Sequence, residues 1–215
     1  QGTAATALFR FLQREHESLA AGLPELPPAL VLGLQEHLDA LSADDLCIGP
    51  RDAASISCRS GIGYAEVYAC PEMTLCLFVL RAGARIPLHD HPGMHVYGRL
   101  LFGRMRVLSF DIEPSSSRSR GAYQANLRND QVLGPDPTTY RLGPVTGNLH
   151  ELEAIEDCAF FDVLTPPYDP YSGRDCTYYR REQVAGAVGE YVLVPVDLWG
   201  FAMQTLVYRG PRFGR

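Results

Sequence analysis

The stretch Ile86-Pro87-Leu88-His89-Asp90-His91-Pro92-Gly93-Met94-His95 holds three of the six histidines of the chain within seven residues. Residues two apart in an extended strand point to the same face, so His89 and His91 would present two imidazoles side by side. Two imidazoles can bind one metal ion, but a metal site needs at least a third protein ligand. The best remaining candidate is His150 in Gly147-Asn148-Leu149-His150. We therefore predict a scaffold that brings His150 back to the first pair.

The composition is that of one globular domain without a nucleic-acid partner. The chain has 215 residues, of which 46% are hydrophobic and 20% are charged, and this is enough for one full core. Its net charge of −6 argues against nucleic-acid binding, for which a basic face is typical. No apolar run approaches the roughly 20 residues that cross a bilayer, so no membrane contact is expected.

The cysteines indicate a reducing compartment. The six cysteines are irregularly spaced and form no CxxC pair, whereas a secreted disulfide-stapled domain would normally be smaller and denser in cysteine. We therefore predict reduced thiols in a cytoplasmic protein, with the nucleus as an additional location, and we expect a monomer.

The first 43 residues are predicted to form a helical layer. Apolar residues recur every three or four positions there, which is the spacing of a helix with one buried face. Prolines at Pro24, Pro27 and Pro28 break the pattern within residues 4–41. We expect this layer to pack on a sheet.

From about residue 64 the pattern changes to that of strands. Short runs of β-branched, aromatic and aliphatic residues are separated by glycine, proline or charged turns, which is typical of a sandwich or barrel. Residues 111–137 are polar and turn-rich, and we predict a long surface loop there; residues 165–176 form a second predicted loop. The predicted strands are residues 64–68, 73–80, 86–91, 100–110, 138–142, 148–154, 158–164, 177–181, 191–196 and 205–208.

Two spacings resemble the cupin motifs. Gly83 followed after five residues by His89-Asp90-His91 resembles the first motif, and Gly147 followed after two residues by His150 resembles the second. The resemblance implies a mainly β fold, a cupin-type double-stranded β-helix or jelly-roll barrel with N-terminal helices. Residues 1–43 would be the helical layer and residues 44–215 the cupin domain, together one structural unit. His95 stands where a cupin acid is expected, so the site departs toward an all-histidine ligand set.

Four motifs in order narrow the resemblance. They are Pro87 to His95, Asn148-Leu149-His150, Asp162 to Tyr168, and Gly173 to Tyr179. Together they resemble the thiol dioxygenase family of cysteamine (2-aminoethanethiol) dioxygenases and plant cysteine oxidases, over roughly residues 40–215. Leu100-Leu101-Phe102-Gly103 is similar to the plant members.

The resemblance implies a non-haem Fe(II) enzyme. His89, His91 and His150 would hold the iron, and both atoms of O2 would be inserted into a thiol to give a sulfinic acid. Three neutral imidazoles leave the charge of the ion uncancelled, which favours an anionic thiolate as the incoming ligand. The implied substrates are the amino-terminal cysteine of peptides or proteins, cysteamine, or both.

Four further residues are candidates for catalysis. Asp162 lies in an apolar run and is costly to bury unless it is paired, with a ligating histidine or a substrate amine as the possible partner; an acid on a surface edge strand is the alternative. Tyr168 resembles a family residue near the iron. Cys176 and Tyr178 share a strand face, and the resemblance associates them with a thioether crosslink; a buried thiol packed on a tyrosine is the alternative.

Other functions remain open at this stage. Three histidines and a water molecule also form a catalytic zinc site, so a zinc-dependent cupin hydrolase or isomerase is one alternative. A non-catalytic metal-binding cupin is another. Pro92-Gly93 interrupts the strand before His95, which leaves that histidine as either a structural or a substrate-facing residue.

Overall fold

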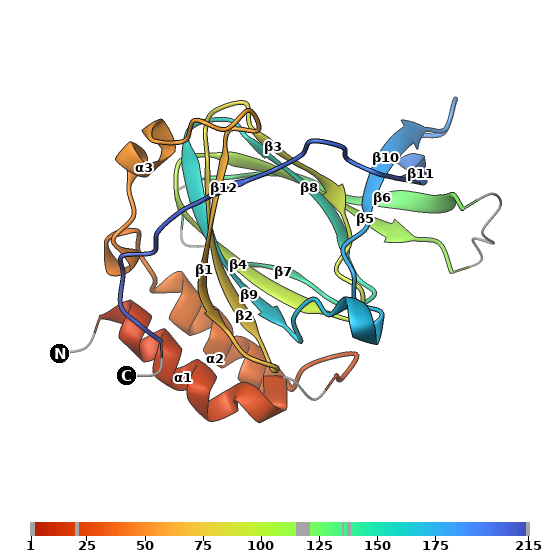
Figure 1. Ribbon diagram of the computed structural model, residues 1–215. Coiled ribbons are helices and arrows are strands. Elements are labelled where there is room, and N and C mark those ends of the chain that lie inside the picture. Colours follow the sequence, from red (N-terminus) through yellow and green to blue (C-terminus); the bar gives the residue numbers. More distant parts are fainter. Residues whose placement is uncertain (1–2, 20–21, 115–120, 135, 137–138, 214–215) are drawn as a thin grey trace.

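The computed structural model describes residues 3–19, 22–114, 121–134, 136 and 139–213. Two β-sheets face each other across a shared interior, and helices cover the outer face of one of them (Figure 1). The predicted mainly β cupin fold with N-terminal helices is thereby confirmed. The helical segments are α1 (Ala4–Leu19), α2 (Pro28–Asp39), α3 (Pro50–Ala54) and the short 3-10 helices η1 (Asp44–Leu46) and η2 (Pro170–Ser172).

The helical layer packs through one apolar stripe on each long helix. Leu8 and Leu12 of α1 and Leu34 and Leu38 of α2 are fully buried and belong to the same cluster as sheet residues such as Phe161. Pro28 begins α2, where its fixed φ suits the first helical turn and no amide is lost. The predicted proline break is confirmed. No helix in the described part of the chain is long and apolar enough to span a membrane.

The first sheet, called sheet A here, has the order β12-β1-β2-β9-β4-β7. All its neighbours are antiparallel except β12 and β1. Its outer face meets the helices and its inner face meets the second sheet, so residues alternate between two buried environments. The strands are β1 (Ile62–Ala69), β2 (Thr74–Leu80), β4 (His95–Phe102), β7 (Thr139–Leu142), β9 (Cys158–Thr165) and β12 (Gln204–Thr205).

The second sheet, sheet B, closes on itself in the order β10-β11-β6-β5-β8-β3. The pairing of Tyr178 with His89 closes the ring. The closure therefore brings the predicted Cys176–Tyr178 segment next to the first predicted metal ligand. The strands are β3 (Arg85–His89), β5 (Met105–Ile112), β6 (Tyr123–Leu133), β8 (Leu149–Ala154), β10 (Tyr178–Gln183) and β11 (Glu190–Val196).

One strand prediction and one loop prediction are wrong. The run 100–110 is divided between β4 and β5, because the chain turns at Gly103 with a φ of 81°. The predicted loop 111–137 contains the 11-residue strand β6, and its residues 115–120, 135 and 137 lie outside the described part. The composition of β6 is polar because one of its faces meets solvent, where Arg106–Asp130 and Arg128–Asp111 pair across β5 and β6 at 2.7 Å.

All six cysteines are free, and two of them, Cys76 and Cys158, are buried. Their reduced state in the cell stays a prediction.

We predict that Gly103→Ala destabilises the fold more than Gly83→Ala. Both glycines have φ near +80°, which costs an alanine about 1–2 kcal/mol. A Cβ at Gly83 meets nothing within 4 Å, whereas one at Gly103 would lie 2.2 Å from the backbone oxygen of Asp157. Urea unfolding should therefore show losses of about 1–2 kcal/mol for the first and about 2–5 kcal/mol for the second. Equal losses would show that the β4–β5 turn is not packed in this way.

Candidate metal centre

A bulge in β3 turns the first histidine toward the interior. Ile86 pairs with Leu152 of β8, but His89 pairs with His150, so β3 carries one residue more than its partner between these two pairs. Such a bulge re-aims the side chains that follow it. Ile86 and Leu152 lie in the interior cluster between the sheets, and the bulge places His89 on the same inner side.

The prediction that His89 and His91 share one strand is wrong in one respect. Strand β3 ends at His89, so His91 lies in the loop that follows. The side chain of Asn148 holds this loop: it accepts a hydrogen bond from the His91 amide at 3.0 Å and donates one to the His91 carbonyl at 2.6 Å. Asn148 was not predicted as a site residue, although it stands two positions before His150.

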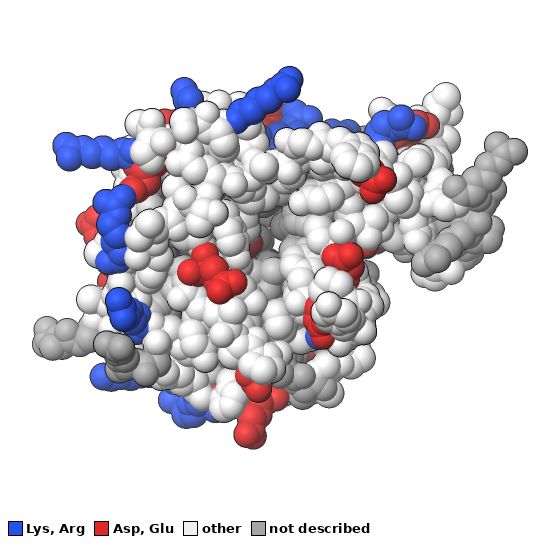
Figure 2. Space-filling model, viewed as in Figure 1, with Lys and Arg blue, Asp and Glu red and all other residues white. Residues whose placement is uncertain are grey.

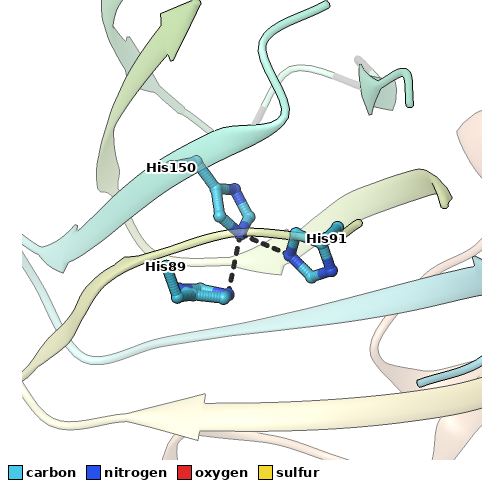
Figure 3. A group of neighbouring side chains, drawn as sticks. All are labelled: His89, His91 and His150. Atoms are coloured by element: carbon cyan, nitrogen blue, oxygen red, sulfur yellow. Dashed lines mark hydrogen bonds between the residues drawn. The ribbon is translucent and has the colours of Figure 1, made fainter. Parts of the chain in front are cut away.

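The three histidines meet as predicted. The Nε2 atom of His150 lies 3.0 Å from Nε2 of His91 and 3.2 Å from Nε2 of His89 (Figure 3). One donor atom from each of the three residues lies within 4.8 Å of the others, and all three residues are buried. Only these three among the described His, Cys, Asp and Glu residues form such a group.

The hydrogen bonds of the rings leave lone pairs facing one another. The Nδ1 atom of His89 contacts the carbonyl of Pro87 at 2.8 Å and must carry the proton of that neutral ring. The Tyr168 hydroxyl donates to the carbonyl of Asp90, so Nδ1 of His91 donates to the Tyr168 oxygen at 2.8 Å. The Nε2 atoms of His89 and His91 therefore carry no proton, and both lone pairs point at the ring of His150.

A bound cation fits this arrangement. A proton on Nε2 of His150 can serve only one of the two bare acceptors, and the buried Nδ1 of His150 has no partner in the structure. One metal ion can accept all three lone pairs at once. The residues present thus match a metal site with three imidazole ligands.

Burial keeps the three imidazoles neutral. Desolvation lowers the pKa of His89 to about 4. It lowers the pKa of His91 and His150 well below the usual value, and the neighbouring rings lower it further. Neutral imidazole is the form that binds a metal ion, so the site is ready for a metal at neutral pH.

Asp90, the residue between the first two histidines, links the loop after β3 to the start of β10. The carboxylate of Asp90 accepts hydrogen bonds from the Thr177 amide and the Tyr179 hydroxyl, both at 2.8 Å. The Asp90 amide donates to the Thr177 carbonyl at 3.1 Å. Asp90 was also missed as a functional candidate, since a lone acid in a loop gives no sign of its partner 87 residues away.

Tyr168, Cys176 and Tyr178 lie beside the histidines. The Tyr168 ring stacks on His91 with 5.2 Å between ring centroids, and the Tyr178 ring lies 6.0 Å from that of His89. Against the larger effect of burial, the Tyr168 and Tyr178 hydroxyls each lower the pKa of the Cys176 thiol. Burial raises the pKa of Cys176 to about 11, so it is a protonated thiol at neutral pH.

Asp162 lies on the inner face of sheet A and is 4% exposed, so the alternative of a surface acid is wrong. The Tyr140 hydroxyl donates a hydrogen bond to its Oδ1 atom at 2.5 Å. No hydrogen bond joins Asp162 to the three clustered histidines: Nδ1 of His89 contacts Pro87, Nδ1 of His91 contacts Tyr168, and Nδ1 of His150 has no partner among the described residues. Burial raises the pKa of Asp162 to about 7, although the tyrosine counteracts part of this effect.

Gly98 makes the contact between Tyr140 and Asp162 possible. A Cβ at this position would lie 1.9 Å from the Tyr140 ring and 2.3 Å from Oδ1 of Asp162. His95, at the start of the same strand, faces outward instead. Its Nε2 atom contacts the Leu23 carbonyl at 2.8 Å, so this histidine ties sheet A to the segment between the helices.

We predict that His89→Ala and His150→Ala lose the bound metal. Each removes one of three convergent donors, so metal content should fall from about one ion per chain to near zero while circular dichroism still reports the β fold. His16→Ala is the control, because that ring lies on α1 and its one hydrogen bond to a described residue is with the Gln13 carbonyl. Elemental analysis after desalting measures the content, and full occupancy in both variants would rule out the assignment.

We predict that Asp162→Asn becomes more stable than the wild type as pH rises. The usual pKa of an aspartate is 3.8, and here it is about 7. Between these values the folded chain keeps a proton that the unfolded chain releases, so wild-type stability falls with rising pH. Well above pH 7, the buried charge of Asp162 lowers the free energy of unfolding of the wild type by on the order of 4 kcal/mol. The asparagine oxygen can still accept from Tyr140.

Urea unfolding at pH 5 and pH 8, at equal metal loading, measures the difference between Asp162→Asn and the wild type. The advantage of the variant should grow between the two pH values. Parallel behaviour of the two proteins would mean that Asp162 is not buried as a titrating acid.

Similarity to known proteins agrees with this geometry. The family model PCO_ADO matches residues 32–212. Human 2-aminoethanethiol dioxygenase is 34% identical over 194 residues, which cover 75% of this chain and 70% of the human protein. Plant cysteine oxidase 2 of Arabidopsis thaliana is 36% identical over 152 residues, which cover 68% of this chain and 55% of the plant protein. A solved cupin superfamily structure from Desulfitobacterium hafniense, 13% identical, covers 53% of this chain and 85% of its own, with a TM-score of 0.38.

The family match extends over most of the chain, from α2 to the segment after β12. The alignment with the human protein also covers more than two thirds of that relative, whereas the alignment with the plant protein covers little more than half of it. The chain therefore belongs to the PCO_ADO family and is a thiol dioxygenase.

Proposed function

We propose that this chain is an Fe(II)-dependent dioxygenase that converts an amino-terminal cysteine, or cysteamine, to its sulfinic acid. The carrying observation is the convergence of the Nε2 atoms of His89, His91 and His150 in a buried site. When bound, iron would supply the redox chemistry by which both atoms of O2 are added to sulfur. We assign the catalytic unit to residues 44–215, with residues 1–43 as a supporting layer.

The number of protein donors supports an open catalytic metal site over a closed structural zinc site. Two nitrogens that bind one ion at about 2.1 Å stand about 3.0 Å apart when their bonds meet at a right angle, and about 3.4 Å apart at a tetrahedral angle. The 3.0 Å separation from His150 to His91 matches the right angle, and the 3.2 Å separation from His150 to His89 lies midway between the two values. A closed structural zinc site would use four protein ligands. The group in the described part of the chain has three, which leaves positions for substrate and O2.

The ligand charge and the surrounding acids support an aminothiol substrate. Three neutral imidazoles leave the charge of the ion to be balanced by a thiolate. Asp162, across the interior, is a buried carboxyl whose ionised form would gain from a nearby ammonium. Its hydrogen-bond partner, Tyr140, contacts Oδ1 and leaves Oδ2 for the substrate. We therefore assign Asp162 to recognition of the substrate amine.

A substrate carboxylate has no evident partner. Arg174 is the single arginine of the motif segments around the site. It already donates to the Pro167 carbonyl at 3.0 Å and lies 3.6 Å from the Asp169 carboxylate. A cation that binds a free amino acid carboxylate would need an unengaged fork of donors. This supports cysteamine and peptides, which lack that carboxylate, over free cysteine.

The remaining candidates complete the proposed site. Tyr168 fixes the proton of His91 on Nδ1 and so keeps Nε2 available. Cys176 and Tyr178 lie along the same side of the histidines, where they would border the bound sulfur. Their crosslinking stays a prediction.

We predict that oxygen uptake by the iron-loaded protein is faster with a peptide that begins with cysteine, and with cysteamine, than with free cysteine at equal concentrations. The physical reason is the amine-only recognition described above. The sulfinate product is identified by mass spectrometry, and the zinc-loaded protein is the metal control. Highest catalytic efficiency with free cysteine would contradict the assignment.

A second pair of substrates tests whether Asp162 recognises the substrate amine. Cysteamine and 2-mercaptoethanol differ in bearing an ammonium or a hydroxyl group. The wild type should prefer cysteamine, and Asp162→Asn should remove about 10–100-fold of that preference, a loss typical of residues that support a metal site. A preference unchanged by the substitution would place the amine elsewhere.

A further inference from the structure

A single polar row crosses the inner face of sheet A. Glu66 of β1 pairs with Cys76 of β2, and Cys76 pairs with Asp162 of β9. Asp162 pairs with Gly98 of β4, which pairs with Tyr140 of β7. Register partners in adjacent strands present their side chains on the same face, so all five positions belong to the face opposite the histidines.

The rest of that face is mostly apolar; its further hydroxyls are those of Tyr64, of Thr74 at the start of β2 and of Thr205 on the edge strand β12. Above and below the row, the inner positions carry hydrophobic and aromatic side chains that join the interior clusters, and Tyr64 adds a hydroxyl that lies 3.4 Å from the Cys76 sulfur. The apolar residues include Ile62, Phe78, Leu80, Val96, Leu100, Phe160 and Leu164. The two acids of this face, Glu66 and Asp162, thus lie in one row across sheet A.

The row leads from the buried acid to solvent. Asp162 and Cys76 are each 4% exposed, whereas Glu66 is an exposed side chain. Glu66 forms no ion pair with any described residue; the salt bridges of the structure involve other acids. Figure 2 shows the molecule hollowed between the two sheets, with acidic side chains on both sides of the hollow.

The distance between the two acids suits a short peptide. Neighbouring strands lie about 4.8 Å apart, so the Cα atoms of Asp162 and Glu66, two strands apart, are separated by about 10 Å. One extended residue advances the chain by about 3.5 Å, and the stem of a lysine or arginine adds the remaining reach. An ammonium held at Asp162 would thus leave the second side chain of a peptide near Glu66.

We propose that Glu66 recognises a cationic side chain at the second position of the substrate, so that peptides beginning Cys-Lys or Cys-Arg are preferred. This inference rests on the proposed function, because it takes the amino-terminal cysteine to be held by the histidine-bound metal and Asp162. Cysteamine ends at its amine and does not reach Glu66. An exposed ion pair of this kind changes a binding constant about two- to five-fold.

The test compares peptides that differ only at the second residue. The iron-loaded full chain is given Cys-Lys, Cys-Gln and Cys-Glu peptides of otherwise equal sequence, and kcat/KM is measured for each. The wild type should prefer Lys over Gln, and Gln over Glu, by about two- to five-fold at each step. The preference should shrink in 1 M salt, where the screening length is about 3 Å.

Variants at Glu66 then identify the responsible side chain. Glu66→Gln should make the three peptides nearly equal, and Glu66→Arg should reverse their order. Because each preference is a ratio within one enzyme, differences in iron loading or folded fraction cancel. Glu36→Gln, an exposed acid on α2 for which the structure gives no ion pair, is the control and should keep the wild-type order.

Two results separate the inference from the proposed function. Oxidation of all three peptides at equal rates by the wild type, or an unchanged order in Glu66→Gln, would overturn the role of Glu66 and leave the thiol dioxygenase assignment standing. Failure of the wild type to oxidise any cysteine peptide or cysteamine would overturn the proposed function and this inference with it.

Discussion

The convergence of three imidazole Nε2 atoms in a buried space is the constraint on which the site depends. Neutral rings held with Nε2 atoms 3.0 and 3.2 Å apart are unfavourable unless a cation lies between them. Pro87 and Tyr168 prevent two of the rings from turning their protons inward, and burial prevents all three from becoming charged. The hydrogen bonds from Asn148 hold the loop that carries His91. The surrounding structure thus prepares a metal site before any metal binds.

The two sheets contribute different parts of the site. Sheet B supplies the metal ligands from β3, β8 and the loop after β3, and its ring closure brings Tyr178 against His89. Sheet A supplies the facing wall, in which one polar row interrupts an apolar surface. A glycine is needed at the centre of this row, because any larger residue at Gly98 would displace Tyr140 from Asp162. Metal binding and substrate recognition therefore reside on separate sheets that face each other.

The metal ligands could be predicted from sequence because His89, His91 and His150 occur in two short motifs whose spacing is itself the signal. The bulge that aims His89 inward could not, since it arises from pairing with β8 rather than from local preference. Strand β6 was missed because its polar residues are matched by charges on β5, across a pairing that no local pattern reveals. The contact of Tyr140 with Asp162 likewise depends on the register of β4, β7 and β9.

The central claim is that a histidine-bound iron in this site adds both atoms of O2 to a thiol. The most direct measurement is isotope labelling: the iron-loaded protein oxidises an amino-terminal-cysteine peptide under ¹⁸O₂ in ordinary water, and the product is analysed by mass spectrometry. The account predicts a sulfinate that carries two labelled oxygens, and no such product from the His150→Ala protein. A product with one labelled oxygen or none, or the same turnover with zinc in place of iron, would contradict it.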